Sequence, residues 1–233
     1  DRDQAFTKYD GALLSILMNI PALRHMRKFD ENLKNVKWFN REAYNLDLTF
    51  ITKSDEKAWL KQAKYIVDNL SDAAIDKAFD HLPKEVIDDT TDKIKSQLKI
   101  RKKHLDKYAR QYYKVLQKTV LIVGTDKKDK FVINRVNNTT QVKVYRMKKD
   151  WEELIHDRTY QSPETKELWI YGLNEEDFFE INGRGNKKIR VRLLGGQGND
   201  TYYVNSGKKV TIYDFDTKYN TINNTGNARE VLS

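Results

Sequence analysis

The sequence predicts an α+β protein, with an N-terminal helical module at residues 1–118 and an all-β domain at residues 119–233. Two changes of pattern lead to this assignment. Apolar residues recur every three or four positions in the first half, as on one face of an α-helix, and they alternate every second position in the second half, as in a β-strand. A third observation is a repeat that aligns residues 171–182 with residues 194–205, which indicates stacked strands.

The helical module is expected to contain four main helices. The first begins at Phe6 and ends before Pro21, because proline lacks the backbone N–H that a helix interior needs. Ser54 and Ser71 suit the N-cap positions of the second and third helices, since a serine hydroxyl accepts a hydrogen bond from the first helical turn. The clearest apolar stripe predicts one continuous helix over residues 91–118.

The first part of the all-β domain reads as a small meander over residues 119–150. Residues 119–124 form a short apolar run, and residues 131–136 and 142–147 alternate between apolar and polar, with turn-forming residues between them. Residues 150–156 are interpreted as one or two helical turns. The meander is expected to cover one end of the repeat that follows.

Residues 164–225 are predicted to form β-solenoid-like rungs. The first two copies share an apolar residue, glycine, aspartate, an aromatic residue and asparagine in the same order, and a looser third copy occupies residues 211–223. A single rung cannot bury its apolar face, so three are close to the minimum for a stable stack. The polar segment after Thr225 is expected to fray.

One of these rungs carries a motif with two interpretations. Residues 195–203 match the nine-residue G-G-x-G-x-D-x-U-x repeat of calcium-binding RTX proteins, in which glycines let backbone carbonyls converge on an oxygen cage for Ca²⁺. That cage needs two copies nine residues apart, whereas the second copy here, residues 172–180, is far from the first and lacks two glycines. In the second interpretation no calcium is bound, and the aspartates accept hydrogen bonds from the backbones of their own loops. The residues of the calcium interpretation are Gly195, Gly198, Asp200 and Asp177.

The helix expected at residues 91–118 is strongly basic, with tyrosines between the basic residues. Such a face could bind a polyanion without reading a sequence, or it could be a solvated face opposite a buried stripe. No zinc-finger, RNP or KH pattern accompanies it, so there is no strong case for nucleic acid. The candidate polyanion-binding residues are Lys95, Lys99, Arg101, Lys102, Lys103, Lys107 and Arg110.

Composition narrows the classes of function. The net charge of +9 favours anionic partners, although a basic surface with no dedicated partner is the alternative. The chain has no cysteine, which excludes disulfides and thiolate metal sites, and its four histidines show no metal-ligand spacing. The longest apolar stretch, residues 11–23, is too short to span a bilayer, so no transmembrane segment is expected.

A pair of carboxylates opens the chain at Asp1 and Asp3, just before the first helix. Carboxylates two residues apart can hold Mg²⁺ together with phosphate oxygens, and this pair is the candidate catalytic site; a charged N-terminal segment is the alternative. The chain begins without methionine, so we expect it to be part of a longer protein whose upstream half would complete such a site.

One resemblance to known proteins rests on residues 1–6, 82–83, 98–105, 112–113 and 167–172 through 195–200. Together these stretches resemble the downstream region of large Gram-negative surface-associated proteins described as calcineurin-like metallophosphoesterases that end in an outer-membrane β-barrel. The resemblance covers most of the chain. The helical half, with Asp1-x-Asp3, is similar to the C-terminal lobe of the spore-coat kinase-like (CotH) family, in which an Asp-x-Asp near this position would hold metal.

The resemblance implies a cell-envelope location, in the periplasm or at the outer membrane, and a link to phosphoester chemistry. The partners would be other domains of the parent chain and an outer-membrane barrel. The main expectation is a non-catalytic accessory or scaffolding region, because the Asp, His and Asn clusters of the calcineurin-like enzymes are absent from this sequence. The alternatives are part of a kinase-like phosphotransfer site, and a module that binds calcium or a polyanion.

Overall fold

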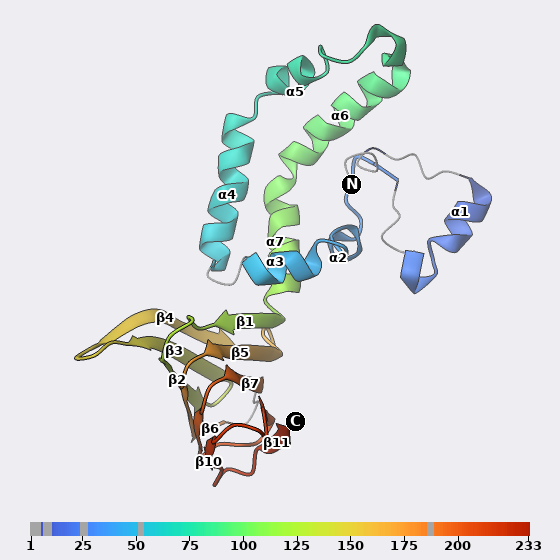
Figure 1. Ribbon diagram of the computed structural model, residues 1–233. Helices are drawn as coiled ribbons and strands as arrows, with labels where there is room; N and C mark the ends of the chain where they lie inside the picture. The colour runs from blue at the N-terminus through green and yellow to red at the C-terminus, as the bar shows by residue number, and fades with distance from the viewer. Residues whose placement is uncertain (1–5, 7–10, 24–27, 51–53, 186–188) are drawn as a thin grey trace. The chain divides into compact units, whose positions relative to one another are not determined.

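Two compact units make up the chain. The computed structural model in Figure 1 describes residues 6, 11–23, 28–50, 54–185 and 189–233. One unit comprises residues 1–47 and 54–115, and the other comprises residues 48–53 and 116–233. The described residues contain seven α-helices and two β-sheets, so the expected combination of helices and strands is confirmed.

The described part of the helical unit contains four short helices and three longer ones. None of the described helices combines the length and the apolar character needed to cross a bilayer, in agreement with the sequence. The helices are α1 (Ala12–Leu17), α2 (Val36–Phe39), α3 (Tyr44–Phe50), α4 (Glu56–Asn69), α5 (Asp72–Ala78), α6 (Asp89–Lys103) and α7 (Leu105–Leu116), with short 3₁₀ turns at Pro21–Leu23 and Lys84–Val86.

Side-chain caps explain where the longer helices begin. Asp55, and not the expected Ser54, caps α4 by accepting a hydrogen bond from the backbone N–H of Ala58 at 2.7 Å. Ser71 caps α5 as expected, through the N–H of Ala74. Asp88 begins α6 with a capping box, in which its carboxylate and the side chain of Thr91 exchange hydrogen bonds with each other's backbone.

The basic helix is broken into two at His104, which corrects the expectation of one continuous helix. His104 has φ −109° and ψ 11°, outside the helical range, and it separates α6 from α7. The apolar stripe continues in phase across this point, so its spacing carries no sign of the break. α7 packs beside α4: Trp59 Nε1 donates a hydrogen bond of 2.8 Å to the carbonyl of Ala109, and the rings of Trp59 and Tyr112 lie 6.3 Å apart.

The strand unit contains two sheets (Figure 1), and successive strands alternate between them from β4 to β11, whereas β2, β3 and β4 lie in the same sheet. The strands are β1 (Thr119–Val123), β2 (Asp129–Val136), β3 (Thr139–Met147), β4 (Glu152–Gln161), β5 (Glu167–Asn174), β6 (Phe178–Arg184), β7 (Arg190–Gln197), β8 (Thr201–Val204), β9 (Val210–Asp214), β10 (Thr221–Asn223) and β11 (Arg229–Leu232). The first sheet has the order β1-β5-β7-β9-β11, and the second has the order β10-β8-β6-β2-β3-β4.

Every pairing in the first sheet is parallel, as are the pairings β2–β6, β6–β8 and β8–β10 in the second. One strand of the first sheet followed by one strand of the second is called a rung below. The pairs β5–β7 and β6–β8 keep the offset that aligned residues 171–182 with residues 194–205. β1 pairs with β5 and lies in a different sheet from β2 and β3, so residues 119–150 are not the expected three-stranded meander.

Two further expectations are corrected in this unit. Residues 150–156 are not helical: β4 begins at Glu152 and pairs antiparallel with β3, because a partner strand supplies hydrogen bonds that the local sequence does not reveal. The segment after Thr225 contains β11, which pairs with β9, so this part of the chain end is ordered by the sheet and does not fray.

The core of the strand unit lies between the two sheets and is built from like residues stacked from rung to rung. The rings of Phe131, Phe179 and Tyr202 stack with centroid separations of 4.7 and 4.9 Å and interplanar angles of 6°. The three side chains are fully buried. Their backbones are therefore held in a fixed register, and the polar residues beside them, two positions earlier in each rung, are also stacked.

Candidate functional site: the aspartate corner

The most distinctive polar group in the strand unit lies where the chain passes from the first sheet to the second. Each of three rungs carries a glycine followed five residues later by an aspartate at this passage. We call this set the aspartate corner; it consists of Gly124 with Asp129, Gly172 with Asp177, and Gly195 with Asp200. The aspartates have exposed fractions of 0, 2 and 0%, which is unusual for a charged residue type.

The aspartates hydrogen-bond from rung to rung. Asp177 Oδ1 accepts the backbone N–H of Asp129, and Asp200 Oδ1 accepts the backbone N–H of Asp177, both at 2.8 Å. Asn220 continues the series one rung further, where its Oδ1 accepts the N–H of Asp200 at 2.7 Å. Each side chain thus satisfies a buried backbone donor of its neighbour, at a point where the strand ladder is interrupted.

The glycines are required because the carboxyl groups pack directly on their backbones. A Cβ atom on Gly172 would overlap Asp177 Oδ2, and a Cβ on Gly124 would lie 2.6 Å from Asp129 Oδ2. A Cβ on Gly195 would overlap Asp200 Oδ2. The shared glycine and aspartate spacing is therefore a packing requirement of the corner.

The second oxygen of each carboxyl group is buried without a hydrogen-bond partner among the described residues. These atoms are Asp129 Oδ1, Asp177 Oδ2 and Asp200 Oδ2. Burial raises the pKa of Asp177 to about 8, and the negative charges of Asp200 and Asp129 add to the rise. Burial likewise raises the pKa of Asp200 to about 6 and that of Asp129 in the same direction.

A fourth carboxyl group lies beside the corner. A Cβ on Gly195 would meet Tyr202 Oη, Asp200 Oδ2 and Asp214 Oδ2 together, so these three oxygens converge on one glycine. Tyr202 Oη donates a hydrogen bond of 2.6 Å to Asp214 Oδ2. The negative charge of Asp214 also raises the pKa of Asp200, after burial.

The structure brings together all four residues of the calcium interpretation. Asp177 and Asp200 are joined by the hydrogen bond described above, and Gly195 and Gly198 border Asp200. Within the described part of the chain, however, no three His, Asp or Glu side chains are grouped so that they could hold a metal ion. The arrangement acts directly on the backbone of the neighbouring rung.

Sequence reasoning missed the first copy of the corner, Gly124 with Asp129. The hairpin β3–β4 separates this copy from the next, so that Asp129 and Asp177 lie 48 residues apart, against 23 for Asp177 and Asp200. A search for glycine, four residues, aspartate, any residue and an aromatic residue, without a fixed repeat length, finds all three copies.

Sequence reasoning also missed a buried cation at the other end of β2. Arg135 is 1% exposed and donates hydrogen bonds of 3.0, 2.8 and 3.0 Å to the carbonyl oxygens of Ser206, Lys208 and Ile189. Burial lowers its pKa to about 10. Arg135 therefore ties together the turns at which the chain passes back to the first sheet, and it is a positioning residue of the fold.

The candidate polyanion-binding residues lie along α6 and α7, and several of them face acidic groups of the same unit. Arg101 stacks on Phe29, with 3.8 Å between its guanidinium carbon and the ring centroid. Lys103 and Lys107 are exposed. Part of the basic face is therefore neutralised internally, by the ion pairs Lys95–Asp92, Lys99–Asp76, Lys102–Asp72 and Arg110–Glu56.

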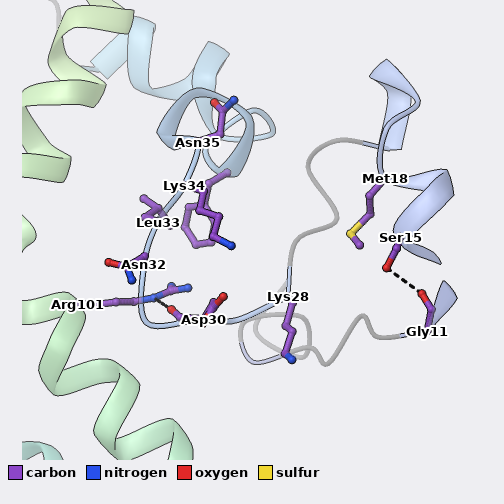
Figure 2. A pocket seen from close by; sticks show the side chains of 11 residues that line it. Gly11, Ser15, Met18, Lys28, Asp30, Asn32, Leu33, Lys34, Asn35 and Arg101 are labelled. Atoms are coloured by element: carbon purple, nitrogen blue, oxygen red, sulfur yellow. Dashed lines mark hydrogen bonds between the residues drawn. The ribbon is translucent and has the colours of Figure 1, made fainter. Parts of the chain in front are cut away.

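A pocket of about 320 Å³ lies in the helical unit (Figure 2). Arg101 reaches it from α6 and donates a hydrogen bond from Nε to the carbonyl oxygen of Asp30 at 2.5 Å. Lys28 and Lys34 also line it, so basic groups outnumber the acidic Asp30. This lining would attract a small anion. Asp1 and Asp3, the candidate Mg²⁺ pair, lie outside the described residues.

A scan against models of protein families found no match, and neither did searches of curated proteins and of solved structures.

Proposed function

We propose that the strand unit is a short β-solenoid that serves as a non-catalytic scaffold in a larger exported bacterial protein linked to phosphoester chemistry. The parallel pairing of successive rungs and the like-on-like stacking of Phe131, Phe179 and Tyr202 support this proposal. The envelope location and the partners, which are other domains of the parent chain and an outer-membrane barrel, come from the resemblance of the sequence.

The main observation behind the scaffold proposal is that the aspartates of the corner make their contacts inside the fold. The Oδ1 atoms of Asp177 and Asp200 accept backbone N–H groups of the neighbouring rung, and the carboxyl groups of all three aspartates pack on glycine backbones inside the fold. Groups that are 0–2% exposed do not meet a dissolved substrate without a rearrangement. The most distinctive motif of the sequence thus stabilises a stack, which is what a rigid spacer needs.

The test uses Asp200 in the full-length parent protein, assayed for phosphoester hydrolysis. Asp200→Asn keeps the oxygen that accepts the N–H of Asp177, whereas Asp200→Ala removes it. A scaffold predicts that Asp200→Asn retains activity and that Asp200→Ala loses activity only in proportion to the unfolded fraction. Loss of activity in a fully folded Asp200→Asn protein would show that the carboxylate takes part in the chemistry.

Calcium binding at the aspartate corner is the second candidate. It is favoured by the buried, unpartnered oxygens of Asp177 and Asp200, since ionised carboxylates in such a place need a cation. A calcium site predicts a rise in melting temperature with millimolar Ca²⁺ that Mg²⁺ does not reproduce and that Asp200→Ala abolishes. An unchanged melting temperature would exclude it.

Polyanion binding by the helical unit is a further candidate, favoured by the basic lining of its pocket and by the exposed Lys103 and Lys107. It predicts retention on heparin that falls steeply with salt. The double variant Lys103→Glu with Lys107→Glu should elute earlier than the wild type, whereas Lys57→Glu with Lys61→Glu, both at exposed positions of α4, is the control with the same change of net charge. Equal elution of the two variants would point to net charge alone.

A further inference from the structure

The aspartate corner presents an electrostatic problem. Adjacent strands in a sheet lie about 4.8 Å apart, so the three stacked carboxyl groups would carry like charges at close range if all were ionised. Each has one oxygen without a partner. The charged and titratable groups that act on them from neighbouring elements are Arg146 on β3, Glu175 and Glu176 between β5 and β6, Tyr202 on β8 and Asp214 on β9.

Among the groups that surround the three aspartates, acidic groups outnumber basic ones. Arg146 acts on Asp129 at one end of the series, and Lys128 forms an ion pair with Glu176. Asp177, in the middle, has carboxyl groups on both sides of it. The stack therefore needs neutralisation by something other than the cations that surround it.

The space around the unpartnered oxygens favours a proton over a metal ion. Asp177 Oδ2 packs so closely against Gly172 that a methyl group on this glycine would overlap it, and the carbonyl oxygen of Gly195 would lie 2.7 Å from the carbon of that methyl group. A proton on Oδ2 occupies almost no volume and would have this carbonyl as a neighbouring acceptor. A calcium ion needs six to eight oxygen ligands, whereas among the described residues no three His, Asp or Glu side chains are grouped so that they could hold a metal ion.

In the fourth rung a neutral side chain, that of Asn220, takes the place of the corner aspartate. Asn220 accepts the N–H of Asp200 through Oδ1, and its Nδ2 donates a hydrogen bond of 3.1 Å to the carbonyl oxygen of Phe215, five residues earlier. Gly195 stands five residues before Asp200, and Gly172 stands five residues before Asp177. An aspartic acid with a proton on Oδ2 has the same donor and acceptor pattern as this asparagine.

We propose that Asp177 and Asp200 are held as neutral aspartic acids while the rungs are stacked, and that loss of their protons loosens the corner, so that the aspartate corner is a pH-operated latch. This inference rests on the stacked scaffold proposed above. The raised pKa values of both groups agree with it. The strand unit would therefore be tightest in a mildly acidic medium and would open towards alkaline pH.

The experiment follows the melting temperature of the full chain between pH 5 and pH 8.5, for the wild type and for Asp177→Asn. The wild type is expected to lose roughly 5 °C or more as the pH rises, on the usual relation between stability and melting temperature. Asp177→Asn, which cannot ionise, should lose distinctly less and should melt above the wild type at pH 8.5. Asp216→Asn, at an exposed site of the same unit, should follow the wild type.

A second measurement uses only the wild-type protein, so it does not depend on whether a variant folds. The side-chain carboxyl carbon of Asp177, followed by NMR in the wild type, should have the chemical shift of a protonated acid at pH 6. An ionised Asp177 at pH 6 would overturn the inference, as would an Asp177→Asn protein whose melting temperature falls with pH as steeply as that of the wild type.

The same melting experiment, repeated with Ca²⁺, distinguishes neutralisation of the carboxyl groups by a proton from neutralisation by a metal ion. If Ca²⁺ raised the melting temperature of the wild type at pH 8.5 but not that of Asp177→Asn, a metal would be the neutralising group and the proton latch would be overturned. An unaltered melting temperature would support the latch. The scaffold proposal fails by a different result, which is loss of the parent protein's activity in a folded Asp200→Asn variant.

Discussion

Asp177 performs two tasks with one carboxyl group, since Oδ1 accepts the N–H of Asp129 and Oδ2 fills the space beside Gly172. The residue is thus constrained in shape as well as in hydrogen bonding. An asparagine meets both constraints, as Asn220 does on the fourth rung. An alanine or a glutamate would meet neither, because the first has no acceptor and the second places its carboxyl group one carbon further out.

Gly195→Ala is expected to destabilise the strand unit by about 1–3 kcal/mol, the usual cost of overpacking a filled core. The added methyl group would collide with Tyr202 Oη, Asp200 Oδ2 and Asp214 Oδ2. Urea unfolding followed by tryptophan fluorescence measures the change. Gln197→Ala, at an exposed position of the same strand, is the matched control and should change the unfolding midpoint little; equal midpoints for the two variants would contradict the packing argument.

Arg135→Met is expected to cost about 3 kcal/mol or more, because each buried acceptor left unpaired costs about 1–3 kcal/mol. The substitution keeps much of the side-chain volume and removes the donors to Ser206, Lys208 and Ile189. Thermal unfolding measures the loss. Arg184→Met, at an exposed site on β6, controls for the change of charge, and a similar melting temperature for both variants would mean that the hydrogen bonds of Arg135 contribute little.

At the scale of elements, the helical unit owes part of its arrangement to ion pairs between α5 and α6. Lys99 Nζ lies 2.6 Å from Asp76 Oδ1, and Lys102 pairs with Asp72. These pairs are partly exposed, so water and salt screen them. They orient the two helices more than they stabilise them, and they explain why a run of basic residues need not imply a nucleic-acid partner.

A double-mutant cycle of Lys99→Met and Asp76→Asn should give a coupling free energy of about 0.2–1 kcal/mol, as is usual for exposed pairs. The coupling should fall further in 1 M NaCl, since the Debye length is then about 3 Å. Urea unfolding followed by circular dichroism at 222 nm reports on these helices. A coupling well above this range at high salt would indicate that the pair is shielded from solvent.

Among the strands, the hairpin β3–β4 is the element that hides the repeat in the sequence. It extends the second sheet on the far side of β2, and it lengthens the first rung without disturbing the parallel pairing of β2 with β6. The corner geometry survives because it depends on which backbones are adjacent, and not on how many residues connect them.

At the scale of the whole molecule, the raised pKa of Asp177 sets the direction of the pH dependence. The unfolded chain releases this proton near the ordinary value of 3.8, whereas the folded strand unit holds it until about pH 8. Stability contributed by the neutral acid is therefore complete below pH 3.8 and is lost as the pH rises towards 8. The loss cannot exceed about 1.4 kcal/mol per pH unit for one proton.

The free energy of unfolding should consequently decline from pH 5 to pH 8, by a few kcal/mol if Asp177 dominates. Urea denaturation at each pH measures it, and an unchanged m-value would show that the same surface is exposed throughout. Asp177→Asn should flatten the curve. A free energy that rises over this range would mean that carboxylates stabilised by cations outweigh the corner.

Much of this architecture could be predicted from the sequence. The N-caps of α4 and α5, Asp55 and Ser71, lie within one residue of the expected caps, and β2 and β3 contain the predicted alternating segments. The break at His104 could not be predicted, because apolar spacing is the same on both sides of it. β4 could not be predicted either, because its hydrogen bonds come from β3.

The sequence by itself determined the change from helical to strand periodicity and the positions of the glycines and aspartates, because both depend on residues that are neighbours in the chain. Only the tertiary structure decided that Asp129, Asp177 and Asp200 form one stack, since residues 48 and 23 positions apart meet through strand pairing. It also decided that these carboxyl groups are buried. Burial and mutual proximity raise the pKa values of Asp177 and Asp200, and no local sequence pattern shows either effect. For this reason a motif that is typical of turns becomes a candidate proton latch.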